Sequence, residues 1–185
     1  MADFTVYTAD TAPEGSKEIL EGAAAKFGFV PNLLGTMAES PTTLKAYMAL
    51  AGLVGETAFD ATEQQVILMT TSFENDCTYC MAAHSTISGM TGVPADVVES
   101  LRAGTALADP KLNSLANFVR ALVQNAGVAD AATTDAFFAA GYTKQHALEV
   151  LVPISQKTIS NFMNHIADTP KDDAFAAQAW VKPAA

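Results

Sequence analysis

Apolar residues recur at intervals of three and four along most of the chain, and only residues 4–8 alternate in the manner of a β-strand. An interval of three to four residues is the period of an amphipathic α-helix. The pattern therefore predicts an all-α protein. The predicted helices lie at about 13–27, from 41 through 53, at 61–75, at 77–90, through 101, at 110–124 and at 143–167, with a turn at 31–34.

Residues at the ends of these segments have side chains that start, stop or bend helices. Ser40 precedes Pro41, and a capping residue followed by proline is typical of a helix start. Asp60 lies three residues before Glu63, which predicts a capping box. Pro153 lies inside the last segment and should bend it, because proline cannot donate a backbone hydrogen bond.

The chain has 185 residues, 50% of them hydrophobic and 16% charged, which is typical of one folded domain spanning 1–185 with small tails at 1–11 and 171–185. Its formal net charge of −10 disfavours nucleic acid and anionic membranes as partners. The sequence has no signal-peptide pattern and no run of 18 apolar residues, so we expect a soluble, cytoplasmic protein.

Two cysteines are too few for a secreted disulfide framework, and both lie in Cys77-Thr-Tyr-Cys80. On a helix, Cys77, Cys80 and His84 would project from one face. In the first helical turn, the helix dipole and free backbone amides lower a thiol pKa, and a nearby imidazole can take up a proton. One sulfur can then attack an oxidised form of the other. The spacing therefore favours a reversible dithiol–disulfide couple.

Two other interpretations of the cysteine pair stay open. The thiols can simply fill space, because cysteine is often buried for packing alone. Zinc is the second, with Cys77, Cys80 and His84 as three ligands and His146 or His165 as a fourth. Structural zinc sites usually take their ligands from two separated pairs, and the chain has no second cysteine pair. No metal site is therefore predicted.

The segment from Asp60 to Ser85, DATEQQVILMTTSFENDCTYCMAAHS, closely resembles the core of the carboxymuconolactone decarboxylase family, specifically its alkylhydroperoxidase D-like, peroxidase-related branch. FGFVPNL at 27–33, Ser40-Pro41 and NFMNHIADTP at 161–170 extend the resemblance over about 13–175. It implies a single multi-helix all-α domain with the CxxC at the start of a core helix. It also implies homo-oligomers, commonly dimers, trimers or hexamers.

The resemblance implies a role for each residue of the CxxCxxxH motif. Cys80 would attack a hydroperoxide, Cys77 would resolve the sulfenic acid, and His84 would belong to a proton relay. The relay glutamate of the family lies twelve residues before the first cysteine, where this chain has Gln65, whose amide cannot accept a proton at neutral pH. The implied function is a thiol-dependent peroxidase-like oxidoreductase with a hydroperoxide substrate, an unidentified dithiol reductant and no cofactor.

Three side chains near the motif are candidates for a direct supporting role. Glu74 precedes the first cysteine by three residues and is a candidate carboxylate for the missing relay acid, although it can simply be solvated. Glu63 is better explained by the capping box than by catalysis. The hydroxyl of Tyr79 could donate to a peroxide oxygen, or its ring could line the pocket.

Four further polar residues are assigned structural roles. Ser72 and Asn75 match the family's pattern and are expected to support the turn that aims the first cysteine. His165 lies on the last helix, whose other face is apolar, and is expected to be a hydrogen-bonded core or interface residue. His146 has no comparable surroundings and is expected at the surface.

The presence of Gln65 in place of a glutamate leaves other functions open. The protein could be a dithiol–disulfide oxidoreductase or a redox sensor with little peroxidase activity. It could also be a non-enzymatic helical interaction module with inert or zinc-bound thiols. Lactone decarboxylation, which the family name suggests, is the least favoured function, because the decarboxylase members do not depend on this cysteine pair.

Overall fold

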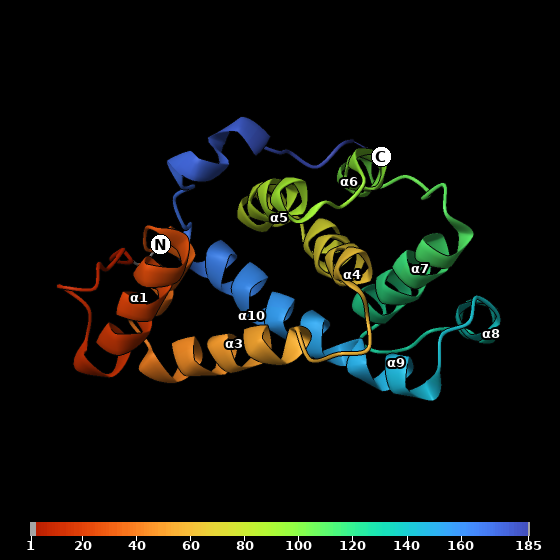
Figure 1. The fold of residues 1–185 in the computed structure, drawn as a ribbon, viewed down its shortest axis with the longest axis horizontal. Coiled ribbons are helices and arrows are strands. Elements are labelled where there is room, and N and C mark those ends of the chain that lie inside the picture. Colours follow the sequence, from red (N-terminus) through yellow and green to blue (C-terminus); the bar gives the residue numbers. More distant parts are fainter. Residues whose placement is uncertain (1–2, 185) are drawn as a thin grey trace.

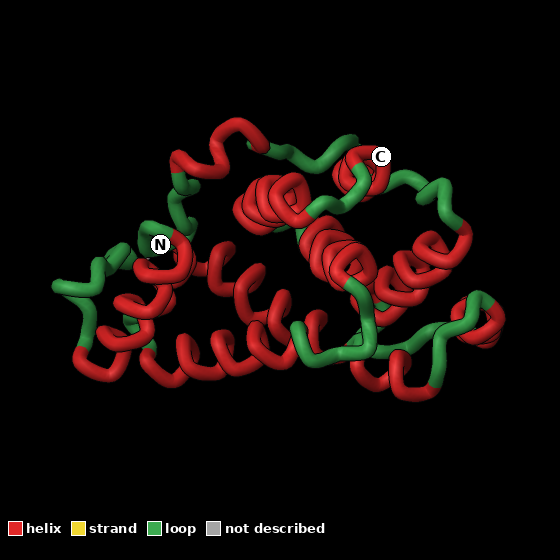
Figure 2. The backbone as a smooth tube through the Cα atoms, viewed as in Figure 1, coloured by secondary structure: helices red, strands yellow, loops and turns green. Residues whose placement is uncertain are grey.

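The computed structural model describes residues 3–184, and within that range every regular element is a helix (Figures 1 and 2). The all-α prediction is therefore confirmed. The elements are α1 (Glu14–Phe27), α2 (Asn32–Met37), α3 (Pro41–Val54), α4 (Ala61–Glu74), α5 (Thr78–Thr91), α6 (Ala95–Ala103), α7 (Pro110–Gln124), α8 (Ala131–Ala139), α9 (Lys144–Glu149), α10 (Leu151–Ala167) and the short 3-10 helix η1 (Asp173–Gln178).

The predicted capping residues account for the helix boundaries that were predicted correctly. Ser40 Oγ accepts a hydrogen bond from the backbone N–H of Thr43 at 3.3 Å. Asp60 and Glu63 form the reciprocal capping box at the start of α4. Gly28 ends α1 with a φ of 81°, in the left-handed region where glycine has no steric penalty.

Three local predictions were wrong. Residues 4–8 are extended but join no sheet, since the backbone bond that links them to a distant part of the described chain runs from Tyr7 N to Gly35 O, at 3.1 Å, on the helix α2. The turn predicted at 31–34 is the start of α2, and the helix α8 was missed. The segment 143–167 is divided at Val150 into the two helices α9 and α10. This boundary lies three residues before Pro153, which belongs to the first turn of α10.

The buried apolar residues form two clusters on either side of α4, α5 and α10. The first lies around α4, α6 and α7 and includes Val66, Met69, Leu115, Val119 and Phe137. The second lies around α1, α2, α3 and the start of α5 and includes Leu20, Met37, Leu44, Tyr47 and both cysteines. Figure 1 shows α10 running beside α3 and below α4 and α5, so α10 passes between the two clusters.

Helix α10 turns its polar face towards the interior and several apolar side chains towards the surface, the reverse of a usual amphipathic helix. Its buried face is mainly polar and carries Gln156, Lys157, Ser160, Asn161 and Asn164. Several of its apolar residues, and one on α9, are instead exposed, namely Leu148, Leu151, Phe162 and Ile166. A polar face turned inward places hydrogen-bonding and charged groups next to α5, where the cysteines lie.

The segment after α10 is an integral part of the fold, although it was predicted to be a tail. Trp180 is 5% exposed, and its indole N–H donates to the backbone oxygen of Arg102 at 2.8 Å. The buried carboxylate of Asp172 accepts from the backbone N–H of Asn32 at 3.0 Å. Residues 171–180 therefore pack across α5 and tie it to α2 and α6. None of the helices in 3–184 combines the length and apolar character needed to cross a membrane.

Candidate active site

A tight turn between α4 and α5 places the cysteine pair. Asp76 has a φ of 53°, which reverses the chain, and the N–H of Cys77 then donates to the backbone oxygen of Ser72 at 2.9 Å. Cys77 is the residue that precedes the first turn of α5, and Cys80 lies within that turn. Both thiols are free, and each residue is only 1% exposed. The positive end of the helix dipole therefore acts on both sulfurs, as the sequence predicted.

Ser72 and Asn75 hold this turn against α10. The side-chain amide of Asn75 donates to the Oδ1 atom of Asn161 at 3.0 Å, and the amide of Asn161 donates to Ser72 Oγ at 3.4 Å. Ser72 in turn donates to the backbone oxygen of Leu68 at 2.8 Å. Two helices and the turn are thus joined by one chain of hydrogen bonds beneath the cysteines.

The sulfur of Cys80 is surrounded by polar groups from α10. Its Sγ atom lies 3.4 Å from Asn164 Nδ2, 3.7 Å from Ser160 Oγ and 3.8 Å from Lys157 Nζ. The Sγ atom of Cys77 lies 3.5 Å from the same Asn164 nitrogen. Because both sulfurs contact one nitrogen atom, they are neighbours, as a dithiol couple requires.

The two thiols differ strongly in acidity. The pKa of Cys80 is lowered, first because the Cys77 thiol donates a hydrogen bond to its sulfur, and further by the charge of Lys157 and the Ser160 hydroxyl, which together outweigh burial. The pKa of Cys77 is raised by its bond to Cys80, by burial and by the negative charge of that neighbour. Cys80 is therefore the thiolate of the pair, and Cys77 keeps its proton.

Lys157, like Ser160 and Asn164, is a site residue that sequence reasoning missed. It is 1% exposed, and it lies between Cys80 and His84, with Nζ 2.8 Å from His84 Nε2. Burial works against its charge, but the negative charge of the Cys80 thiolate beside it raises the pKa of Lys157 overall. The only sequence signal was its spacing, because 153, 156, 157, 160, 161 and 164 fall on one helical face.

His84 and Gln65 continue this chain of contacts away from the sulfurs. His84 Nδ1 lies 2.9 Å from Gln65 Oε1, which brings together two residues that the sequence placed in one relay. Burial, together with the positive charge of Lys157, holds the pKa of His84 well below its usual range, so the imidazole is neutral. An ammonium group only donates, so Nε2 accepts from Lys157 and the N–H of Nδ1 donates to Gln65. His84 thus reaches Cys80 through Lys157.

The other predicted polar residues near the motif bind elsewhere. The Tyr79 hydroxyl donates to Asp172 Oδ2 and accepts from the backbone N–H of Leu33 at 3.1 Å, so it fastens α5 to the C-terminal segment. Burial, followed by the bond to Asp172, raises the pKa of Tyr79. The carboxylate of Glu74 is held by Arg120 at 2.8 Å on α7.

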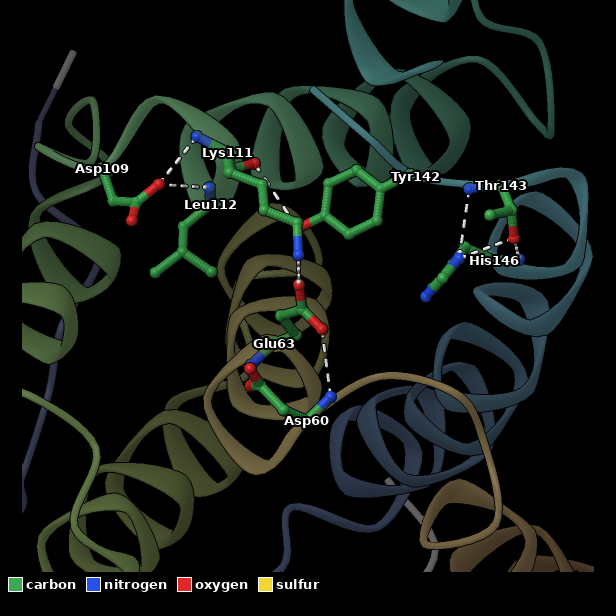
Figure 3. A network of polar contacts seen from close by, with 8 residues as sticks. All are labelled: Asp60, Glu63, Asp109, Lys111, Leu112, Tyr142, Thr143 and His146. Carbon is green, nitrogen blue, oxygen red and sulfur yellow. Dashed lines mark hydrogen bonds and ion pairs between the residues drawn. The ribbon is translucent and has the colours of Figure 1, made fainter. Parts of the chain in front are cut away.

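Glu63 belongs to a separate polar network at the start of α4 (Figure 3). Its carboxylate closes the capping box with Asp60 and forms an ion pair with Lys111 at 2.7 Å. The same view shows His146 beside Thr143, with which it caps α9. His146 was expected at the surface and is half-buried. The capping role predicted for Glu63 is therefore confirmed.

The geometry does not assemble a zinc site in the part of the chain that the structure describes. No three of its cysteine, histidine and carboxylate side chains are grouped as metal ligands, and the ammonium of Lys157 lies between Cys80 and His84. His165 is exposed on α10 and is not a core residue, so that part of its prediction was wrong.

A small hollow of about 130 Å³ opens beside the first cysteine. Cys77, Asn164 and the ring-bearing Tyr79, expected as a lining residue, border it together with His165. Two acidic residues, Asp76 and Asp168, give it a negative edge. Since Asn164 contacts both sulfurs, a small molecule in this hollow would lie next to the dithiol pair.

The fold and the dithiol site together define a class of all-α proteins with a paired-cysteine centre at the start of a core helix, and solved structures resemble the chain over nearly its whole length. A peroxidase-related protein from Ralstonia eutropha JMP134, described as an alkylhydroperoxidase AhpD core, is 21% identical and matches 95% of this chain and 96% of its own with a TM-score of 0.80. The debrominase Bmp8 is 20% identical over 95% of this chain and 94% of its own, with a TM-score of 0.78.

A third similar structure is an uncharacterized peroxidase-related protein from Silicibacter sp. TM1040, 18% identical over 94% of this chain and 95% of its own, with a TM-score of 0.78. No protein-family model and no curated protein matches the sequence. The structural matches show that the chain has the alkylhydroperoxidase D-like fold, as the resemblance in its sequence implied.

Proposed function

We propose that the protein is a thiol-dependent peroxidase-like oxidoreductase in which Cys80 attacks and Cys77 resolves. The observation that carries the proposal is the surroundings of the Cys80 sulfur, where a buried ammonium group, a hydroxyl, an amide and a neighbouring thiol all stabilise a thiolate. A thiolate is the nucleophilic form of cysteine, and a second thiol beside it closes a disulfide. The fold of its structural neighbours agrees with this kind of function.

The reaction proceeds in two steps. The Cys80 thiolate attacks the terminal oxygen of a hydroperoxide, so an S–O bond forms, the O–O bond breaks, and the sulfur is oxidised to a sulfenic acid while the substrate leaves as an alkoxide that takes up a proton. The Cys77 thiol then attacks the Cys80 sulfur, a disulfide forms and water leaves. A dithiol reductant restores the pair and is itself oxidised to a disulfide.

The hollow beside Cys77 supports a route for this reductant. Cys77 lines the hollow, whereas Cys80 contacts the polar face of α10. An external thiolate is therefore expected to attack the Cys77 sulfur of the disulfide and release Cys80 as the leaving thiolate. The cytoplasm remains our proposed location, because two cysteines are too few for a secreted disulfide framework.

Self-association remains part of this proposal. The exposed apolar residues of α9 and α10 leave a face without an intramolecular partner in the described part of the chain, and such faces are commonly interfaces. The face consists of Leu148, Leu151, Phe162 and Ile166. We expect light scattering to give a mass above that of one chain, and Phe162→Glu to reduce it. A monomer at all concentrations would contradict the proposal.

The test is intact mass with thiol counting on the reduced protein, before and after a stoichiometric dose of cumene hydroperoxide. We expect rapid loss of two hydrogens and of both thiols. Cys80→Ser should leave the remaining thiol unreacted, and Cys77→Ser should gain one oxygen as a sulfenic acid. Unchanged thiols in the folded wild-type protein would overturn the proposal.

A second candidate function is a dithiol–disulfide oxidoreductase without peroxidase activity, which Gln65 favours because it supplies no carboxylate to the relay. Oxidation by a disulfide such as oxidised lipoamide, without oxidation by a hydroperoxide, would select it. Adding 2,3,4-tribromopyrrole, the ligand in one structure of Bmp8, as a third oxidant tests whether the dithiol instead removes halogen.

A further inference from the structure

Lys157 is a buried cation that lacks a carboxylate partner. Within residues 3–184, no carboxylate oxygen lies within 4 Å of its nitrogen, since the ion pairs of this part of the chain involve Lys17, Lys111 and Arg120. A buried charge is stable only when it is paired and hydrogen-bonded. The Cys80 sulfur at 3.8 Å is therefore the anion that balances Lys157 in the reduced protein.

The other groups that face Lys157 are neutral. His84 on α5 accepts its hydrogen bond at 2.8 Å, and burial holds the pKa of that imidazole low. Tyr47 on α3 is buried with a raised pKa, chiefly because of burial, and Cys77 keeps its proton. The ammonium of Lys157 and the thiolate of Cys80 thus form an isolated ion pair. If only one of the two groups is neutralised, the other is left as an unpaired buried charge, which is unfavourable.

We propose, on the basis of the proposed function, that Lys157 is the catalytic acid of the reaction, giving a proton from Nζ to the oxygen that leaves when Cys80 attacks a hydroperoxide. The Nζ atom lies next to the attacking sulfur, so the departing alkoxide is released beside a cation that carries three protons. As the thiolate is consumed, the anion that stabilises the ammonium is lost, and burial favours the neutral amine.

The whole reaction then balances inside the site. The ammonium and thiolate become an amine and a sulfenic acid when the alkoxide takes the proton and leaves as an alcohol. When the Cys77 thiol closes the disulfide, its proton leaves with the hydroxide of the sulfenic acid as water. The ion pair is converted into two neutral groups, so no buried charge is left unpaired and no carboxylate is required. His84 and Gln65 act as positioning residues that orient Nζ.

The experiment compares Lys157→Met and Lys157→Arg with the wild-type protein and with Lys45→Met, the same substitution at an exposed lysine on α3. Iodoacetamide alkylation over a range of pH reports the Cys80 pKa without any peroxide. Lys157→Met should raise that pKa towards the ordinary value near 8.5, which lowers the alkylation rate at pH 7 by up to about 30-fold, while the Cys77 hydrogen bond keeps part of the lowering. Lys157→Arg should keep the pKa low, because it keeps the cation.

Two oxidants then separate the role of the charge from the role of the proton. Cumene hydroperoxide has a poor alkoxide leaving group that needs an acid, whereas peracetic acid releases a carboxylate that does not. At a pH where Cys80 is fully ionised, both Lys157 variants should react with cumene hydroperoxide about 100-fold more slowly than the wild type, and with peracetic acid at nearly the wild-type rate. A guanidinium does not release its proton, so Lys157→Arg should behave like Lys157→Met here.

Each outcome separates this inference from the proposed function. Equal losses with both oxidants, or no loss with either, would overturn the role of Lys157 as acid while leaving the peroxidase in place. A wild-type protein that reacts with neither oxidant would overturn the proposed function. If the variants do not fold, the test is the rate of the wild-type protein with a series of hydroperoxides whose leaving groups differ in pKa. An acid that protonates the leaving oxygen makes this rate only weakly dependent on the leaving-group pKa. A steep dependence would contradict the role of Lys157 as acid.

Discussion

Removing the Cys80 sulfur should destabilise the protein far more than the loss of one small side chain would. In Cys80→Ala, the buried Lys157 loses the one anionic partner that it has among residues 3–184. If it keeps its charge, an unpaired buried cation costs about 3–5 kcal/mol. If it releases its proton instead, the cost at pH 7 is about 1.36 × (10.4 − 7), or roughly 4.6 kcal/mol. Both routes give a loss of about 4 kcal/mol.

Urea denaturation of a double-mutant cycle measures this interaction. Lys157→Met also leaves a buried thiol without its cation, but that thiol is neutral at pH 7 and costs less. The double variant Cys80→Ala/Lys157→Met has no buried charge, and its free energy of unfolding should lie closer to that of the wild type than the single variants predict. We expect a coupling energy of about 2 kcal/mol or more between the two positions.

The pH dependence gives an independent check. In Cys80→Ala the folded-state pKa of Lys157 is lowered, so the unfolded chain binds more protons and stability increases as the pH rises. The free energy of unfolding of Cys80→Ala should therefore lie below that of the double variant by an amount that shrinks by about 1.36 kcal/mol per pH unit and vanishes near pH 10.4. The ion pair would be refuted if the two single substitutions change the free energy of unfolding additively and if the difference between Cys80→Ala and the double variant stays constant from pH 7 to pH 10.

Three further outcomes follow from contacts elsewhere in the structure. Gln65→Glu should raise the pKa of His84, because a carboxylate would replace the amide oxygen 2.9 Å from Nδ1, and NMR titration of the imidazole measures this shift. Glu63→Gln should cost about 1–2 kcal/mol at pH 7, and since the Lys111 and Asp60 contacts hold the pKa of Glu63 low despite burial, the difference from wild type in urea should disappear as the pH falls below about 4. Trp180→Ala should cost about 3–5 kcal/mol and lower the melting temperature in calorimetry, and an unchanged melting temperature would contradict a structural role for residues 171–180.

The helices with strong local signals could be predicted from the sequence. Ser40 and the Asp60 capping box satisfy backbone amides with side chains only three residues away, so the start of each helix is a local property. The cysteine turn was likewise predicted, because the spacing of Cys77 and Cys80 places both at a helix start. The helix α8 lacks such a clear apolar stripe, since Phe137 is buried while Phe138 beside it is partly exposed.

The part of the site that could not be predicted from the sequence depends on tertiary structure. Lys157 lies 77 residues after Cys80, and lysine is among the residues least often buried. Nothing local distinguishes it from a solvated lysine, and only the packing of α10 against α5 turns it inward. The same packing explains why Glu74, three residues before the first cysteine, points to Arg120 on α7 and not to the thiols.

The polar inner face of α10 contributes polar groups to the site and little to the apolar packing of the core, whereas the inner face of a core helix usually packs the core. The two apolar clusters bury most of the hydrophobic surface, and α10 contributes to them mainly through Ile154, Ile159 and Met163 at its flanks. Its residues between 156 and 164 instead determine the charge and hydrogen bonds around the sulfurs. A substitution there can alter the chemistry while both clusters stay whole, so one helical face can be redesigned or diversified in evolution without rebuilding the interior.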